Sequence, residues 1–193
     1  EMAYKIESEI TKGSLGKQDH YIAAYGGIKH ISYSKKKVSI SSLKLKKKNL
    51  KMFLDSSFLI WTGKNRIAAN VLKDQKKNFL NNYENLVMLN QFTKKFKIEF
   101  EKPKLDVKKL AKIISQTWIL KKRFSKYISN NQIDKIFKKI ENKGAYGGKL
   151  LGAGNGGFIL VLSSIKKKKE LIKYLNNYKY LDIKLENNGS IIL

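Results

Sequence analysis

The chain has 193 residues, of which 42% are hydrophobic, enough for one packed domain or for one domain plus part of another. It has no cysteine, two histidines and no run of eighteen apolar residues, which excludes disulfides, thiolate metal sites, a metal centre built from histidines and a membrane-spanning helix. Taken alone, the formal net charge of +26 suggests a nucleic acid or another anionic surface as partner.

Residues 1–56 predict helices that flank a β-hairpin. Apolar residues recur at helical spacing from Ala3 to Ile10 with no cap before them, so we expect the chain to begin inside a helix and to lack the start of a longer protein. In order, the pattern predicts a helix tail at 1–12, a glycine break at 13–16, a short helix at 18–25 ended by Gly26-Gly27, strands at about 28–34 and 37–45, and a helical stretch near 50–54.

Residues 57–193 predict a second, larger region of α+β class. Apolar residues at helical and strand spacing indicate a small antiparallel sheet with helices on one face. The expected elements are a buried strand at 58–61, helices at about 66–80, 83–99 and 105–125, a helix capped by Asn130 or Asn131 with Ile133, Ile136, Phe137 and Ile140 inward, a glycine-rich loop at 144–157, a strand at 158–162, a lysine-headed helix at 166–178, and strands near 180–186 and 190–193.

The loop at 144–157 is the most informative segment. Its many glycines permit positive φ angles and close approach of the backbone to another group, and consecutive N–H groups without side chains can form an anion-binding nest. The loop precedes a strand, whereas Walker and Rossmann loops open a helix, so neither of those motifs fits. A glycine-rich tight turn without function is the alternative reading.

The sequence Gly-Gly-Lys-Leu-Leu-Gly-Ala-Gly-Asn-Gly-Gly-Phe at 147–158 resembles the third signature motif of the GHMP kinases, a superfamily of small-molecule kinases that includes galactokinase and mevalonate kinase. Asn155 stands where that motif usually has glycine, a mild departure because asparagine tolerates left-handed backbone. The resemblance implies that the phosphate side of the active site is shaped by Gly152, Ala153, Gly154, Asn155, Gly156 and Gly157.

A second segment, Gly16-Lys17-Gln18-Asp19-His20-Tyr21, places a carboxylate at the start of a short helix. By itself this arrangement is more typical of a helix cap than of catalysis. It resembles the Gly-x-x-Asp-Gln pattern of sugar kinases in the same superfamily, most closely the heptose 7-phosphate kinases, with His20 in place of the glutamine. That resemblance implies that Asp19 is the catalytic base.

Two more segments resemble the heptose 7-phosphate kinases. Thr62-Gly63-Lys64-Asn65-Arg66 is similar to their Thr-Gly-x-x-Arg segment, and Trp118-Ile119-Leu120-Lys121 to their Trp-x-Leu-Lys segment. Arg66 is one of only two arginines in the chain, and a phosphate that needs a planar fork would explain it. Lys17, Arg66 and Lys121 are therefore candidates for the distal phosphate of the sugar. An ordinary helix-start arginine and a lysine that extends along the core edge are the alternatives.

The resemblance implies a ferredoxin-like C-terminal domain at 57–193, preceded at 1–56 by the end of the N-terminal domain. It also implies a cytoplasmic enzyme that uses ATP and Mg²⁺ to phosphorylate the anomeric hydroxyl of a sugar phosphate, without membrane or specific nucleic-acid partners. The family's phosphate loop, Pro-x-x-x-Gly-Leu-Gly-Ser-Ser, does not occur in the chain. We therefore expect the parent enzyme to be active and this chain alone to be inactive.

Two other readings remain open. A GHMP kinase for fucose or another free sugar would leave Arg66 and Lys121 with structural roles, because a free sugar has no second phosphate. A basic α/β nucleic-acid-binding module would need lysines gathered on one face with exposed aromatic rings. The charge comes almost entirely from lysines spread over nearly every predicted helix, which favours a solvated surface over a nucleic-acid reader.

Overall fold

A computed structural model describes residues 1–11, 16–34, 36–64, 68–78 and 80–191, and the chain separates into two compact units. The first unit combines Glu1–Lys44 with Lys184–Leu193, and the second is Leu45–Ile183. This division lies earlier than the predicted boundary between 56 and 57, because the predicted helical stretch near 50–54 packs with the strand that follows it. The assignment of residues 1–56 to an N-terminal domain of the family stays a prediction.

The first unit is a helical segment and a hairpin, held together with the end of the chain. Its elements are α1 (Met2–Thr11), α2 (Gln18–Tyr25), β1 (Lys29–Tyr33) and β2 (Val38–Ser42). The Gly27 N–H donates to the Glu186 carbonyl at 2.8 Å, and the Ser190 N–H donates to the Ala23 carbonyl at 3.0 Å. Ser190 and Ile191, expected in a final strand, have no strand conformation; the rest of that strand and most of the predicted glycine break at 13–16 lie outside the described residues.

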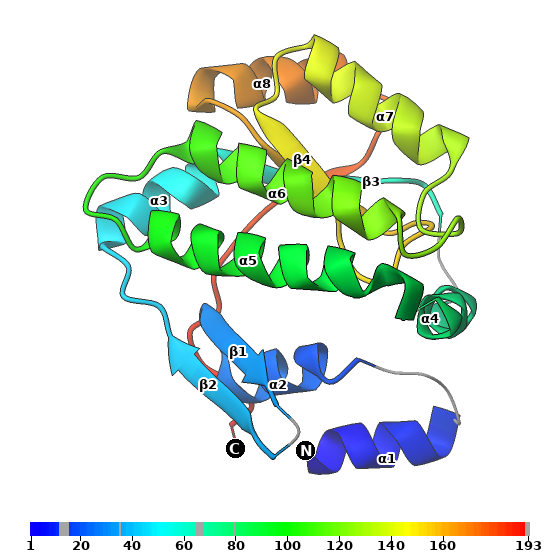
Figure 1. Ribbon diagram of the computed structural model, residues 1–193. Coiled ribbons are helices and arrows are strands. Elements are labelled where there is room, and N and C mark those ends of the chain that lie inside the picture. Colours follow the sequence, from blue (N-terminus) through cyan, green and yellow to red (C-terminus); the bar gives the residue numbers. More distant parts are fainter. Residues whose placement is uncertain (12–15, 35, 65–67, 79, 192–193) are drawn as a thin grey trace. The chain divides into compact units, whose positions relative to one another are not determined.

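The second unit contains the larger sheet and most of the helices (Figure 1). In chain order its elements are α3 (Lys47–Asp55), β3 (Ser57–Trp61), α4 (Ala68–Lys77), the short 3₁₀ helix η1 (Leu80–Asn82), α5 (Tyr83–Phe100), α6 (Val107–Lys122), α7 (Asn131–Asn142), β4 (Gly147–Leu150), β5 (Phe158–Leu162), α8 (Ile165–Tyr174) and β6 (Tyr180–Asp182).

The sheet of the second unit has the order β4-β5-β3-β6, with every neighbouring pair antiparallel. One strand is followed by helices, then by two consecutive strands, a helix and a last strand, which is the ferredoxin-like arrangement. The predicted α+β class with an antiparallel sheet is confirmed. Within the described residues, no helix is both long enough and apolar enough to cross a bilayer.

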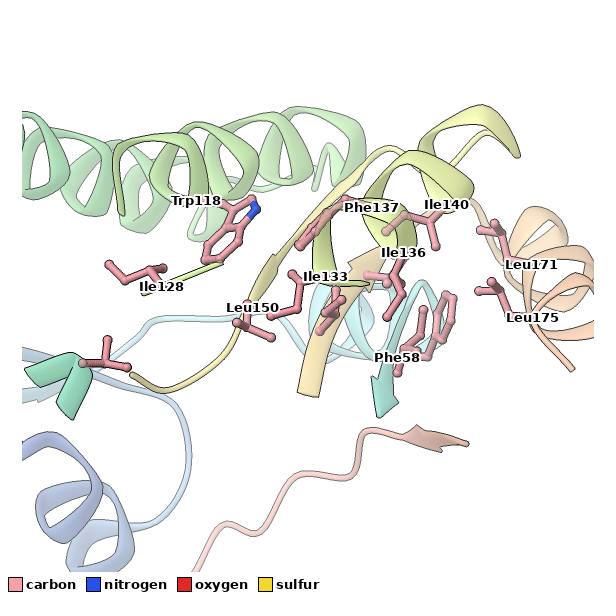
Figure 2. Close-up of a cluster of buried hydrophobic side chains, with 14 of the residues drawn as sticks. Phe58, Trp118, Ile128, Ile133, Ile136, Phe137, Ile140, Leu150, Leu171 and Leu175 are labelled. Atoms are coloured by element: carbon pink, nitrogen blue, oxygen red, sulfur yellow. The ribbon is translucent and has the colours of Figure 1, made fainter. Parts of the chain in front are cut away.

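The core lies between the sheet and the helices α6, α7 and α8 (Figure 2). Ile133, Ile136, Phe137 and Ile140 follow helical spacing and form one buried face of α7, as predicted. They point toward Phe58 of β3 and Leu171 of α8. Each fully buried side chain of this size contributes about 1.5–3 kcal/mol from removal of apolar surface from water.

β4 is the main element that the sequence pattern missed, since it lies inside the predicted loop at 144–157. Glycines disfavour strands because they have no side chain to pack and lose much backbone entropy. Close packing against α6 requires glycine at position 147: a Cβ on Gly147 would lie 2.2 Å from the Ser115 hydroxyl oxygen and 2.8 Å from the Ala111 carbonyl oxygen of α6. The Gly148 N–H donates to the same Ser115 oxygen at 3.1 Å.

Replacing Asn130 with Ala is expected to lower the free energy of unfolding by about 1 kcal/mol. The Asn130 side-chain oxygen accepts a hydrogen bond of 3.1 Å from the Ile133 N–H, so Asn130 is the N-cap of α7 and Asn131 is the first helical residue. Urea denaturation of Asn130→Ala and of Asn131→Ala provides the measurement and its matched control. Equal losses in the two variants would contradict the assignment of the cap.

Candidate functional site

The glycine-rich connection at 151–157 joins β4 to β5 and is fixed at both ends. The Leu151 N–H donates to the Phe158 carbonyl at 2.8 Å, which closes the base of the connection. The Gly157 carbonyl accepts from the Thr62 N–H at 3.0 Å and from the Thr62 hydroxyl at 2.8 Å. The Thr62-Gly63 turn and the glycine loop, two motifs separated by nearly ninety residues of sequence, therefore lie side by side.

The middle of the loop is held against two other segments. The Asn155 N–H donates to the Ile128 carbonyl at 2.8 Å, and the Gly157 N–H donates to the Lys64 carbonyl at 3.1 Å. A Cβ on Gly154 would lie 2.8 Å from the Ile128 Cα, so this position accepts only glycine without a shift of the backbone. Asn155 has a φ of 62°, the left-handed conformation that its place in the motif demands.

Several loop N–H groups remain available. Among the described residues, the N–H groups of Gly152, Ala153, Gly154 and Gly156 have no hydrogen-bond acceptor, while those of Asn155 and Gly157 are satisfied. Backbone N–H groups in a positive-φ segment form the kind of concavity that binds anionic oxygen atoms. The loop thus fits an anionic group such as a phosphate.

Lys121 lies in the last turn of α6, and its ammonium group donates to the Gly152 carbonyl. The helical position predicted an inward lysine, and the structure brings it to the start of the glycine loop. A lysine ammonium group carries three N–H donors and a positive charge. A positive charge beside backbone N–H groups strengthens the attraction of this part of the second unit for an anion.

Asp19 lies in the first turn of α2 in the other unit, and its side chain is exposed. The N-cap position is occupied by Lys17, and no side-chain cap is formed, so the helix-cap reading of Asp19 fails. Within the described residues the Asp19 carboxylate has no hydrogen-bond partner. A carboxylate that is held on a helix and not engaged in a structural bond is suited to accept a proton.

Two tyrosines that the motifs did not assign a role lie near Asp19. The rings of Tyr21 and Tyr33 meet edge to face with centroids 6.3 Å apart. Burial, followed by the charges of Tyr21 and Asp19, raises the pKa of the Tyr33 hydroxyl above its usual value. Tyr33 therefore remains a neutral hydroxyl near the Asp19 charge, and only the fold of the hairpin brings it there.

The neighbours of Asp19 are engaged with α1. His20 Nε2 lies 2.6 Å from the Glu7 carboxylate, and its ring meets Tyr4 edge to face. The Lys17 ammonium lies 3.8 Å from the Glu1 carboxylate and 4.9 Å from the centre of the Tyr4 ring. These contacts give His20 and Lys17 a packing role in the first unit, beside the substrate role predicted for Lys17.

Lys149 on β4 is a further charged group inside the signature motif, one that the sequence pattern did not single out. Burial lowers the pKa of its ammonium group. Arg66, predicted to bind a phosphate, lies outside the described residues. Among the described residues no group of three His, Cys, Asp or Glu side chains could hold a metal ion.

Comparison with known proteins places these features in a family context. Residues 99–180 match the family model described as GHMP kinases C terminal. The chain is 31% identical over 176 residues to a D-glycero-alpha-D-manno-heptose 7-phosphate kinase from Campylobacter jejuni, which covers 90% of this chain and 52% of that protein. It is 32% identical over 133 residues to a bifunctional fucokinase/GDP-fucose pyrophosphorylase from Arabidopsis thaliana, over 67% of this chain and 12% of that protein.

The fold agrees with a solved structure as well. A crystal structure of a D-glycero-D-manno-heptose 1-phosphate kinase from Bacteroides thetaiotaomicron superimposes with a TM-score of 0.68 at 24% identity, over 97% of this chain and 52% of that chain. At this identity the likeness is one of fold. The chain spans about half the length of the Campylobacter relative and of this crystal structure.

Proposed function

The chain belongs to the GHMP kinase family through its C-terminal domain, and from this premise we propose that it is part of an ATP-dependent kinase that phosphorylates the anomeric hydroxyl of heptose 7-phosphate. The observation that carries the choice of sugar is the 31% identity with the Campylobacter heptose 7-phosphate kinase over 90% of the chain. We propose activity for the full-length protein and expect none from these 193 residues alone, which lack the family's phosphate-loop sequence.

In the proposed reaction, Asp19 is the general base. Its carboxylate accepts the proton of the anomeric hydroxyl while the oxygen of that hydroxyl attacks the terminal phosphorus of ATP, and the bond from that phosphorus to the bridging oxygen breaks. The products are the heptose 1,7-bisphosphate, ADP and the proton held by Asp19. The exposed carboxylate in the first turn of α2, without a hydrogen-bond partner among the described residues, supports this role.

We assign the glycine loop and Lys121 to anion binding. The N–H groups of Gly152, Ala153, Gly154 and Gly156 are positioned by the anchoring bonds of Asn155 and Gly157, so binding a phosphate needs little rearrangement of the loop. Lys121, which contacts Gly152, adds positive charge there. Lys17, Arg66 and Lys121 remain our candidates for the sugar's own phosphate.

A kinase for fucose or another free sugar is the second candidate function. The 32% identity with the bifunctional Arabidopsis protein, whose name includes a fucokinase, favours it. The two candidates differ in whether the substrate already carries a phosphate. That difference makes Arg66 and Lys121 the residues that discriminate between them.

Replacing Arg66 with Ala in the full-length protein is expected to weaken heptose 7-phosphate binding by about 1.5–3 kcal/mol, the range for hydrogen bonds to charged groups. The same heptose without its 7-phosphate should be a poor substrate, and the substitution should change its turnover little. Substrate affinity from titration calorimetry and kcat/KM for both sugars provide the measurement.

Arg123→Ala is the matched control, because Arg123 is the chain's other arginine and is exposed at the end of α6. Its guanidinium lies 3.5 Å from the Asn85 side-chain oxygen, a structural contact. Equal effects of the two substitutions, or a free sugar that is turned over as well as heptose 7-phosphate, would favour the free-sugar reading.

A further inference from the structure

A basic groove lies on α7 and the end of α8, and neither the glycine loop at 151–157 nor Lys121 is among its lining residues. Its volume is about 870 Å³, within the range of small-molecule sites. All its lining residues belong to the second unit. Most lie on α7 or at its N-cap, from Asn130 to Asn142, and the others are Lys64, Tyr174 and Tyr178. Figure 1 shows α7 and α8 next to each other.

The groove concentrates positive charge without compensation. Lys64, Lys135, Lys138 and Lys139 line it, and among the described residues no Asp or Glu does. None of these lysines forms an ion pair with a described carboxylate. In contrast, three lysines near the end of α5 all form ion pairs with glutamates. They are Lys97 on α5, Lys102 after it and Lys109 on α6. Four like charges around one hollow repel each other, and an anion relieves that repulsion.

The rest of the lining suits a ligand with more than phosphate groups. Tyr174 and Tyr178 provide aromatic walls, and their rings already attract cations: the Lys139 ammonium lies 5.5 Å from the Tyr178 ring centre and the Lys143 ammonium 4.5 Å from that of Tyr174. Asn131 and Asn142 add amide groups that both donate and accept hydrogen bonds. The lysines can bind phosphates, the tyrosine rings can stack on a base, and the amides can hydrogen-bond to the edge of that base. Together these groups match a nucleotide.

The groove is also connected to the glycine loop. Lys64 lines the groove, and its carbonyl accepts the hydrogen bond from the Gly157 N–H at 3.1 Å. Asn130 lines the groove, and its side-chain amide donates to the Asn155 side-chain oxygen at 2.9 Å. A ligand that binds Lys64 or Asn130 therefore alters the hydrogen bonds that hold the loop that we assign to phosphate binding.

We propose that the basic groove is an effector site that binds a nucleoside diphosphate and is separate from the kinase site. The test is titration calorimetry of the chain with ADP and with GDP. Lys135→Glu/Lys139→Glu on α7 should weaken binding about tenfold or more, because two of the cations are reversed. The matched control, Lys108→Glu/Lys112→Glu on α6, has the same spacing and charge change on exposed positions and should change binding less than about threefold.

Three results would overturn the proposal. One is the absence of ADP and GDP binding at millimolar concentration, and another is an equal loss in the groove and control variants, which indicates general electrostatic attraction. The third is a single-stranded oligonucleotide that binds more tightly than either nucleotide and depends on the same lysines, which indicates a nucleic-acid surface. A melting curve checks that each variant is folded, and Lys135→Gln/Lys138→Gln replaces the first variant if it is not.

The proposed kinase function can fail independently of this site. In the full-length protein the groove variants should leave turnover without added diphosphate unchanged and should remove any effect of GDP on it. A substitution of Asp19 should do the opposite, with turnover lost and calorimetric GDP binding retained. A groove variant that abolishes turnover itself would contradict a separate effector site.

Discussion

Asn in place of Asp19 in the full-length protein is expected to lower kcat about 100-fold or more, the scale of general acid–base catalysis, with a smaller change in affinity for the sugar. The amide keeps the size of the side chain but cannot take the proton from the anomeric hydroxyl. The carboxylate does not cap α2 and has no described hydrogen-bond partner, so the substitution should leave the fold intact. Steady-state kinetics and a thermal melt of each variant make the measurement.

Glu84→Gln provides the control for a carboxylate in the first turn of a helix. Glu84 is exposed at the start of α5, so it shares the favourable interaction with the helix dipole and has no proposed part in catalysis. Its substitution should leave kcat within about twofold of the parent value. If Asp19→Asn also turns over at a nearly normal rate, Asp19 is not the base and the proposed mechanism is wrong.

The sequence predicted the elements whose periodicity is local. The buried face of α7 could be read directly, since Ile133, Ile136 and Ile140 recur at helical spacing and are all buried. β4 could not be read from the sequence, because two consecutive glycines have low strand propensity. They are accommodated through long-range pairing, in which Gly148 lies opposite Val161 of β5. The final strand expected at 190–193 failed where it is described, since Ser190 bonds to the Ala23 carbonyl of a helix.

The candidate site likewise contains residues that local motifs predicted and residues that they did not. The motifs identified Asp19, Lys121 and the glycine loop, and the contact of Lys121 with Gly152 connects two of them within the second unit. The residues that support them were not predictable. Tyr33 comes near Asp19 because a hairpin folds back, and Ile128 holds the loop through a backbone carbonyl, which carries no sequence signature. Local motifs predict the candidate groups, whereas the residues that hold those groups in place depend on the whole fold.

Glycine occupies positions of the signature motif for two different reasons, and substitutions can distinguish them. Gly147 and Gly148 lie in β4, whereas the glycines from 152 onward form the loop. Replacing Gly147 with Ala is expected to lower the free energy of unfolding by about 3–5 kcal/mol, the sum of overpacking against α6 and of a strained backbone. The new Cβ would lie 2.2 Å from the Ser115 hydroxyl oxygen, and the φ of Gly147 is +154°. Chemical denaturation of the chain measures the loss.

Gly144→Ala is the control that isolates the backbone strain. Gly144 has a positive φ of 85°, but a Cβ there meets only the flexible Lys167 side chain, at 3.4 Å. Its substitution should cost about 1–2 kcal/mol, since the left-handed conformation is disfavoured but no rigid group is in the way. Ser115→Ala should restore only part of the stability of Gly147→Ala, because the Ala111 carbonyl oxygen still lies 2.8 Å from the added Cβ. If Gly147→Ala is no worse than Gly144→Ala, close packing of α6 is not the reason for glycine in β4, and a direct role of Gly147 in the site becomes the better explanation.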